Sequence, residues 1–264
     1  MPARVRYITD PACPDSWAAE PLLRRLMLEF GESLSFTWVM GGLARDYRDG
    51  PAPVDRWLAV SSESRMPLDP LLWRESPIAS TYPACMAVKA AQEQGEEAGT
   101  RFLRAAREGI MCFRRKLDGT EALVEAAREA GLDVRRFRVD LQSHAIVEAF
   151  GEDLEERRSF DGGEPLPLPS AVLVAEDGSR TPHSWPFVYD ELRDAAAAAG
   201  AKAAGEERTA VLDALRRFGR MATREVEEVC RMPEPRAFAE LWRLASEFEV
   251  KPTRVLTGWL WESA

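Results

Sequence analysis

The sequence has few of the residues that build metal sites or structural disulfides. Only two histidines, His144 and His183, occur among its 264 residues, which excludes a histidine-rich metal site. The four cysteines stand at positions 13, 85, 112 and 230, and none lies within four residues of another. Zinc ligands are typically paired at much shorter spacing. We therefore expect no metal centre, and in a reducing compartment we expect the four thiols to stay free.

Long apolar runs and an excess of positive charge are also missing. No stretch approaches the roughly 18 continuous apolar residues of a membrane span, and the first residues lack the apolar core of a secretory signal. We therefore expect a cytoplasmic protein with no membrane partner. The net charge of −9 argues against broad nucleic-acid binding, because such binding requires cations that face phosphates.

The first forty residues have the pattern of a βαβ unit. Residues 5–9 form a short apolar run that predicts a strand. From Trp17 onwards, apolar residues recur at three- and four-residue spacing, which predicts a helix ending at Gly31. Residues 34–40 predict a second strand. A strand, a helix and a strand in this order imply that the two strands are parallel.

Helical patterns dominate the middle of the chain. They cover residues 84–94, 99–107, 120–130 and 140–150, after a segment at 51–64 that reads as a loop. A compact apolar strand is predicted at 171–175, a turn at 176–179, a second strand near 185–188 and a helix at 189–199. The whole pattern is that of an α/β domain.

The composition changes at residue 206. Helices are predicted at 209–218, 223–229 and 236–248, followed by a strand-like segment at 252–261. The alanine- and glycine-rich residues 195–205 form the expected junction, so we divide the chain into a domain at 1–205 and a winged-helix-like C-terminal module at 206–264.

A winged-helix arrangement raises the question of DNA binding. Residues 206–264 contain 11 acidic and 10 basic side chains, a balance that makes nucleic acid an unfavourable partner. The apolar end of the module, Trp259-Leu260-Trp261, indicates instead a protein contact. The contact can be with the first domain, with a second copy in a homodimer, or with a partner protein.

Cys13 is the candidate reactive residue. It follows the first strand and opens the helix, where unpaired N–H groups stabilise a thiolate, the nucleophilic form. Pro14 suits the first turn, and Ser16 can donate a hydrogen bond to the sulfur. Asp15 acts against this, since a nearby carboxylate raises the pKa of a thiol. The alternative is an inert, buried cysteine.

Several segments of the sequence resemble DsbA-family thioredoxin-like proteins. They are Asp10–Trp17 (DPACPDSW), Glu20-Pro21, Val39–Leu43 (VMGGL), Leu72–Pro77 (LWRESP), Ser80–Ala84 (STYPA) and Leu168–Leu173 (LPSAVL). The resemblance covers about residues 4–200 and points to the cytosolic branch that includes the ClpXP-adaptor proteins. It implies a thioredoxin-like fold with a helical insertion at about 55–160. It also implies a cis peptide before Pro169, with the backbone of Leu168 beside Cys13.

The resemblance implies thiol–disulfide chemistry, with one departure from the family's pattern. Redox-active members carry C-x-x-C, whereas here the second cysteine is Ser16. A C-x-x-S site can form a mixed disulfide but no internal disulfide, so an external thiol such as glutathione must resolve it. We therefore predict a monothiol oxidoreductase acting on a thiol or disulfide substrate, without a resident cofactor. The predicted catalytic residues are Cys13 and Ser16, and the predicted substrate-binding residues are Pro14, Trp17, Leu168 and Pro169.

Two other functions stay open. The chain can be a non-catalytic protein-binding adaptor that has kept the thioredoxin fold. It can also be a glutathione-linked isomerase or transferase. Kappa-class glutathione transferases and 2-hydroxychromene-2-carboxylate isomerases are similar in layout and carry a Ser-Pro-Tyr-Ser-type motif at this place. Trp17 has an alternative of its own, which is packing against the second strand.

Overall fold

A four-stranded sheet forms the centre of the first domain in the computed structural model, which describes residues 3–47, 52–205 and 208–264. The strand order is β2-β1-β3-β4. The bounds are Ala3–Thr9 for β1, Leu34–Met40 for β2, Ser170–Val174 for β3 and Arg180–Ser184 for β4. β1 and β2 are parallel along their whole length, as the βαβ pattern predicts, and β3 and β4 run antiparallel to their neighbours.

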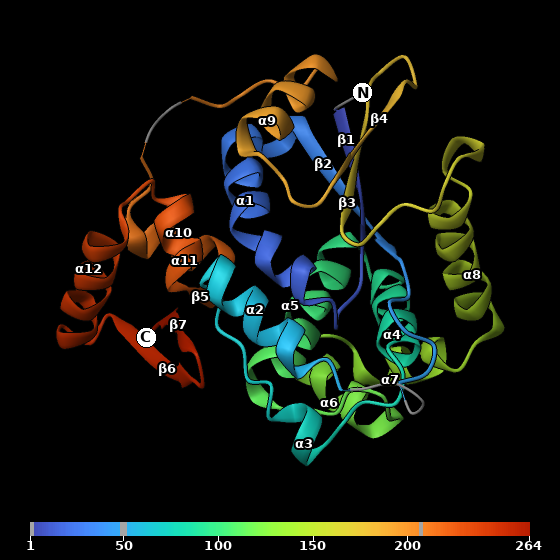
Figure 1. The fold of residues 1–264 in the computed structure, drawn as a ribbon, viewed down its shortest axis with the longest axis horizontal. Coiled ribbons are helices and arrows are strands. Elements are labelled where there is room, and N and C mark those ends of the chain that lie inside the picture. The colour runs from blue at the N-terminus through green and yellow to red at the C-terminus, as the bar shows by residue number, and fades with distance from the viewer. Residues whose placement is uncertain (1–2, 48–51, 206–207) are drawn as a thin grey trace.

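Helix α1 (Pro14–Phe30) connects the two parallel strands and lies along one face of the sheet (Figure 1). Pro14 stands in its first turn, where the missing N–H costs nothing, and Gly31 ends it with a positive φ of 50°. The buried faces of β1 and α1 meet in the largest apolar cluster of the domain, which includes Tyr7, Trp17 and Leu23. A smaller cluster around Ile8 and its strand neighbours covers the other face.

The helical insertion lies between β2 and β3 in the chain; most of it is at the end of the sheet where β1 runs into α1, and its last helix lies beside the sheet (Figure 1). Its helices are α2 (Val54–Ser64), α3 (Leu72–Glu75), α4 (Tyr82–Gln92), α5 (Glu96–Phe113), α6 (Thr120–Glu129), α7 (Val134–Leu141) and α8 (His144–Arg158). Helix α9 (Tyr189–Ala198) closes the domain. Among the described residues, no helix is long and apolar enough to cross a membrane.

Three predictions for this domain differ from the structure. The helix predicted at 140–150 spans the break at 142–143 between α7 and α8. The loop predicted at 51–64 is a helix from Val54 onwards, since Trp57 and Val60 are buried against the core, and residue 51 lies outside the described residues. The strand predicted near 185–188 is instead β4, which begins at Arg180. The turn at 176–179 reverses the chain at once, with Gly178 at a φ of 84°, so pairing with β3 starts directly after it.

The C-terminal module has its own core and its own sheet. Its elements are α10 (Val211–Phe218), β5 (Met221–Ala222), α11 (Thr223–Val229), α12 (Glu234–Ser246), β6 (Val250–Val255) and β7 (Gly258–Ser263). The strand order is β5-β7-β6, all antiparallel. The three helices predicted here are present, with one correction to the segment that follows them. The strand predicted at 252–261 is a hairpin that turns at Leu256 and Thr257. The boundary predicted at residue 206 lies outside the described residues.

The module packs against the first domain through α1, α2 and α5. Trp261 is buried in the module's own core, whereas Leu260 joins the core of the first domain. The Thr257 hydroxyl bonds to both the backbone N–H and the carbonyl of Leu68, at 2.7 and 3.0 Å. Of the three contacts open for the apolar end of the chain, docking onto the first domain is the one present in the structure.

Candidate functional site

Cys13 caps the N-terminus of α1, directly after β1 and a short turn. Its Sγ accepts a hydrogen bond from the backbone N–H of Ser16 at 3.4 Å, and its own N–H donates to the carbonyl of Asp10 at 3.2 Å. The placement between strand and helix is therefore the predicted one. The side chain, however, is only 2% exposed.

Leu168 and Pro169 lie at the same end of the sheet as Cys13. The antiparallel register pairs Ile8 with Ser170, so the residues that continue each strand, Thr9 and Pro169, follow side by side. The Leu168–Pro169 peptide is cis. Leu168 also packs over Gly41 at the end of β2, because a Cβ on that glycine would lie 2.5 Å from the Leu168 Cδ2. Three strand ends thus meet where α1 begins.

Asp10 is the central polar group of this site, although it is not among the residues predicted from the sequence. Its carboxylate is fully buried. It accepts from the Ala12 and Leu43 N–H groups at 2.7 and 2.6 Å, from the Thr81 hydroxyl at 2.7 Å and from the Cys85 thiol at 3.2 Å. It therefore joins β1, the segment after β2 and the start of α4. Asp10 is the first residue of the motif Asp10-Pro11-Ala12-Cys13. The motif does not reveal its role, because most of its side-chain partners lie far away in the chain.

Burial controls the electrostatics of the two nearby thiols. It raises the pKa of Cys13 to about 11; interactions with Ser16 lower this pKa in part, and the carboxylates of Asp10 and Asp15 add to the rise. Burial also raises the pKa of Cys85 well above its ordinary value, and Asp10 acts in the same direction. Both groups are therefore protonated at neutral pH.

Pro14, Ser16 and Trp17, three other predicted site residues, are also inside the protein, whereas Leu168 is partly exposed. Pro14 and Ser16 are buried in the first turn of α1. Trp17 is fully buried, donates its indole N–H to the Pro67 carbonyl at 2.8 Å, and has the Arg104 guanidinium over its ring at 4.5 Å. The structure thus places Trp17 in the core, against Pro67 and Arg104.

A buried ion-pair group lies one turn further along α1. Glu20 pairs with Arg107, a fully buried cation whose other nitrogen donates to the Thr9 hydroxyl at 2.7 Å. This contact links α1 and α5 to the end of β1. No group of His, Cys, Asp and Glu in the described part of the chain is arranged to hold a metal ion.

Comparison with known proteins decides the family. A family model described as thioredoxin matches residues 7–173. The chain belongs to the DsbA-like thioredoxin-fold family. Two relatives of this chain are ClpXP adapter proteins named SpxH. That of Halalkalibacterium halodurans is 31% identical over 206 residues, which cover 72% of this chain and 66% of that protein, so the matched part spans about two thirds of the relative.

A second relative extends the similarity over the C-terminal module. The SpxH of Shouchella clausii is 29% identical in an alignment that covers 98% of this chain and 89% of that protein. Among solved structures, the cytosolic disulfide reductase DsbM of Pseudomonas aeruginosa, with GSH, has a TM-score of 0.59 at 17% identity. It covers 74% of this chain and 96% of that one. At this identity the likeness to DsbM shows the DsbA-like fold alone.

Proposed function

We propose that this protein is a cytoplasmic adaptor, which binds a protein and presents it to a ClpXP-type protease. The thioredoxin fold then serves as a scaffold, and Cys13 is a packed residue. The observation that carries the proposal is the state of Cys13: the thiol is buried, its pKa is raised to about 11, and Ser16 stands where a resolving cysteine would be.

The chemistry of the thiol favours this function over catalysis. The thiolate is the nucleophile in thiol–disulfide exchange. With a pKa of about 11, about one Cys13 in ten thousand is ionised at pH 7, against a few per cent for an ordinary thiol. Without a second cysteine at position 16, a mixed disulfide formed at Cys13 also has no partner in the same motif.

Exposed aromatic side chains of the C-terminal module support the proposal that the partner is a protein. On α12, Phe238 and Trp242 are each 38% exposed, and Trp242 packs edge-on to Trp259 with ring centroids 5.2 Å apart. Exposed aromatic groups of this kind are typical of protein contacts. The alignment with the Shouchella clausii adapter protein extends over this module.

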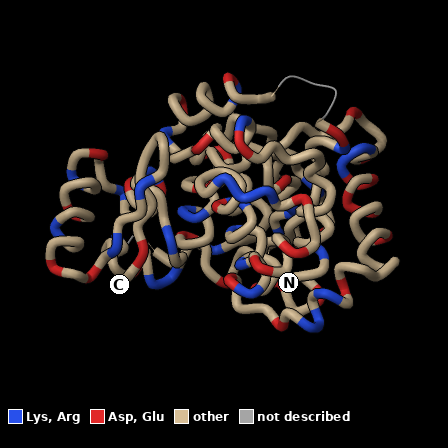
Figure 2. The backbone as a smooth tube through the Cα atoms, turned by 90° about the horizontal axis from the view of Figure 1, so that it is seen from below, with Lys and Arg blue, Asp and Glu red and all other residues tan. Residues whose placement is uncertain are grey.

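The charge on α12 does not favour nucleic acid. Arg243 is paired with Glu240 at 2.8 Å and with Glu247 at 2.6 Å, so its charge is neutralised on the helix itself. Figure 2 shows acidic and basic residues interspersed along the described part of the module. Phosphate contacts would require basic residues gathered on one face.

Reconstitution with purified components tests the proposal. Proteins that accumulate when either this protein or ClpXP is removed from the host are first identified by quantitative proteomics, and one of them is purified. We expect this protein to accelerate its degradation by ClpXP several-fold, and Cys13→Ser to retain at least half of that effect. Loss of the effect in Cys13→Ser, or no acceleration for any accumulating protein, would contradict the proposal.

A second candidate is the monothiol oxidoreductase, favoured by the Ser16 N–H bond to the Cys13 sulfur. The Cys13 thiolate would attack a glutathione mixed disulfide on a substrate. It would release the substrate thiol and take up the glutathionyl group, which a second glutathione then removes as oxidised glutathione. A transferase step is less favoured, because a thiolate at Cys13 would repel the thiolate of bound glutathione.

Ser16→Cys distinguishes the two candidates, since it restores the C-x-x-C motif. A gain of insulin-reducing activity that Cys13→Ser abolishes would support the oxidoreductase. No gain, in a variant that folds with the same circular dichroism spectrum, would support the adaptor.

A further inference from the structure

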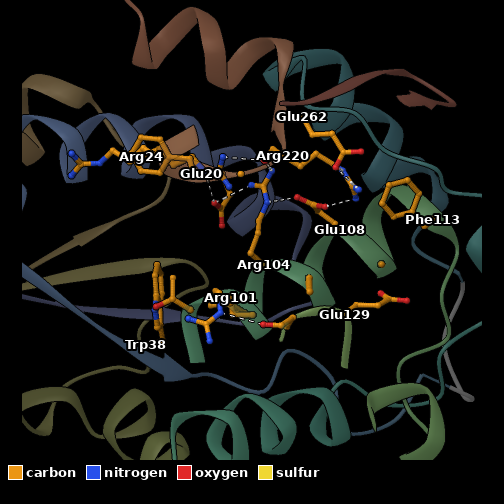
Figure 3. Close-up of a pocket in the computed structure, with 18 of the residues that line it drawn as sticks. Glu20, Arg24, Trp38, Arg101, Arg104, Glu108, Phe113, Glu129, Arg220 and Glu262 are labelled. Atoms are coloured by element: carbon orange, nitrogen blue, oxygen red, sulfur yellow. Dashed lines mark hydrogen bonds and ion pairs between the residues drawn. The ribbon is translucent and has the colours of Figure 1, made fainter. Parts of the chain in front are cut away.

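A cavity of about 570 Å³ lies at the junction of the first domain and the C-terminal module. Its walls come from α1 and α5, from the turn between α10 and β5, and from β7 (Figure 3). This volume is in the range of sites for small organic molecules. The cavity begins about two helical turns beyond Cys13, because Glu20 in its wall is seven residues further along α1, about 10 Å at the rise of an α-helix.

The cavity is rich in arginine, although the protein as a whole is acidic. Six arginines and four glutamates line it. Four of the arginines are neutralised by the four glutamates. These pairs are Arg24 and Arg104 with Glu20, Arg220 with Glu108 and Glu262, and Arg115 with Glu129. Glu225, which is buried behind the wall, also pairs with Arg24 and Arg104.

Two of the six arginines that line the cavity have no carboxylate partner among the described residues. Arg101 donates its Nε to the Ala130 carbonyl at 3.2 Å, and Arg217 donates one terminal nitrogen to the Met27 carbonyl at 3.3 Å. Within residues 3–47, 52–205 and 208–264, neither forms an ion pair. Each guanidinium is therefore held in place by a backbone bond and keeps other N–H groups for an anion.

The rest of the lining is apolar and partly aromatic. Trp38, Phe113 and Phe218 face the cavity together with Met27 and Leu103. Figure 3 shows Trp38, Arg101 and Glu129 on the side opposite Glu20, Glu108 and Arg220, so the ring and the cation Arg101 face the ion pairs of Glu20 and Arg220 across the cavity. The indole N–H of Trp38 is already bonded to the Thr100 hydroxyl at 2.7 Å, which fixes the ring.

We propose that this cavity is a binding site for a small organic anion with a flat apolar body. A phosphate or carboxylate binds to Arg101 and Arg217, and the apolar body packs against the aromatic side chains. Arg101 belongs to the first domain and Arg217 to the module, so the ligand contacts both. This site is independent of Cys13 and of the adaptor function.

Calorimetric titration of the full chain tests the site with three probes of one shape. They are 1-naphthyl phosphate, 1-naphthoate and neutral 1-naphthol. We expect saturable binding of at least one anion and at least tenfold weaker binding of the neutral probe. The stronger anion identifies the class of headgroup. If neither anion binds at millimolar concentration, or if naphthol binds as well as the anions, the proposal is wrong.

Substitutions locate the binding. Arg101→Gln and Arg217→Gln should each raise the dissociation constant about tenfold, the effect of losing one charge-assisted hydrogen bond of about 1.4 kcal/mol. Arg216→Gln is the matched control, since this neighbour is exposed, pairs with Asp213 and does not line the cavity. It should bind like the wild type. All three side chains are exposed, so folding should be unaffected. Equal affinity in all variants would overturn the assignment.

Discussion

At Cys13 two opposing effects act on one sulfur atom. The helix N-terminus and the Ser16 N–H stabilise a thiolate, and a helix dipole typically contributes about 0.3–1 kcal/mol, less than one pKa unit. Removal of the thiol from water costs more, and the pKa of Cys13 rises to about 11. The position of a cysteine at a helix start therefore does not by itself make it reactive.

The pH dependence of alkylation follows from this pKa. Below the pKa the thiol is protonated, so the rate of Cys13 modification by iodoacetamide should increase about tenfold per pH unit from pH 7 to pH 10. It should show no plateau in that range. Mass spectrometry of the Cys13 peptide gives the rate separately from the other three cysteines. An unstructured cysteine peptide, the control, should level off near pH 9. A plateau for Cys13 below pH 8 would mean that the thiol is activated.

Asp10 should contribute strongly to stability. Asp10→Ala leaves two backbone N–H groups and the Thr81 hydroxyl without their acceptor, and we expect a loss of about 2–4 kcal/mol in the free energy of unfolding. Urea denaturation measures it. Asp177→Ala is the control, because Asp177 bonds only locally to Ser179 in an exposed turn, and its loss should be below about 1 kcal/mol. Similar losses in both variants would show that Asp10 is not a central group.

At the scale of elements, the segment after β2 has to pass very close to the insertion. Gly42 has a φ of 59°, and a Cβ there would lie 2.8 Å from Leu154 and 2.9 Å from Tyr82. Gly42→Ala therefore combines backbone strain with overpacking. We expect it to lower the free energy of unfolding by about 2–4 kcal/mol.

Gly131→Ala separates these two causes. Gly131 also has a positive φ, 72°, but nothing lies within 4 Å of its missing Cβ. Its substitution should cost about 1 kcal/mol, from backbone strain alone. Both values come from chemical denaturation at one pH. Equal losses for the two glycines would mean that the insertion can move away from Gly42.

The elements also show how far local patterns reach. The βαβ unit was predictable because its signals are local: the spacing of apolar residues indicates each element, and Gly31 marks the end of the helix. Helix α2 was missed because Pro53 and several polar serines surround its few buried residues. The prediction placed β4 too late in the chain, because its residues, including Pro182, have no apolar pattern. They form a strand only because they pair with β3.

At the scale of the whole molecule, buried ion pairs join the module to the first domain. Glu225 is fully buried, pairs with Arg24 at 3.0 Å and with Arg104 at 2.7 Å, and accepts the Ala222 N–H at 2.6 Å. Arg24 lies on α1 and Arg104 on α5, so one carboxylate connects three elements. The module and the first domain should therefore unfold together.

Glu225→Ala tests whether these ion pairs couple the unfolding of the module to that of the first domain. It leaves two buried guanidinium groups with one carboxylate fewer, and removal of one partner from such a group costs about 3–5 kcal/mol. We expect one urea transition for the wild type and an earlier transition of the module in the variant. Glu240→Ala, on the exposed face of α12, should change stability by less than about 0.5 kcal/mol. Two separate transitions in the wild type would show that the module and the first domain do not unfold together.

The sequence by itself determined the βαβ unit, the place of Cys13 at the start of α1, the three helices of the C-terminal module and the position of Leu168 and Pro169 before a strand. These features depend on periodicity, turn residues and motifs within short segments. Only the tertiary structure decided that Cys13 is buried, that Asp10 binds Thr81 and Cys85, and that a cavity forms between α1, α5 and the module. Burial, pKa and cavities arise where segments far apart in the chain pack together, and no local pattern specifies which segments these are.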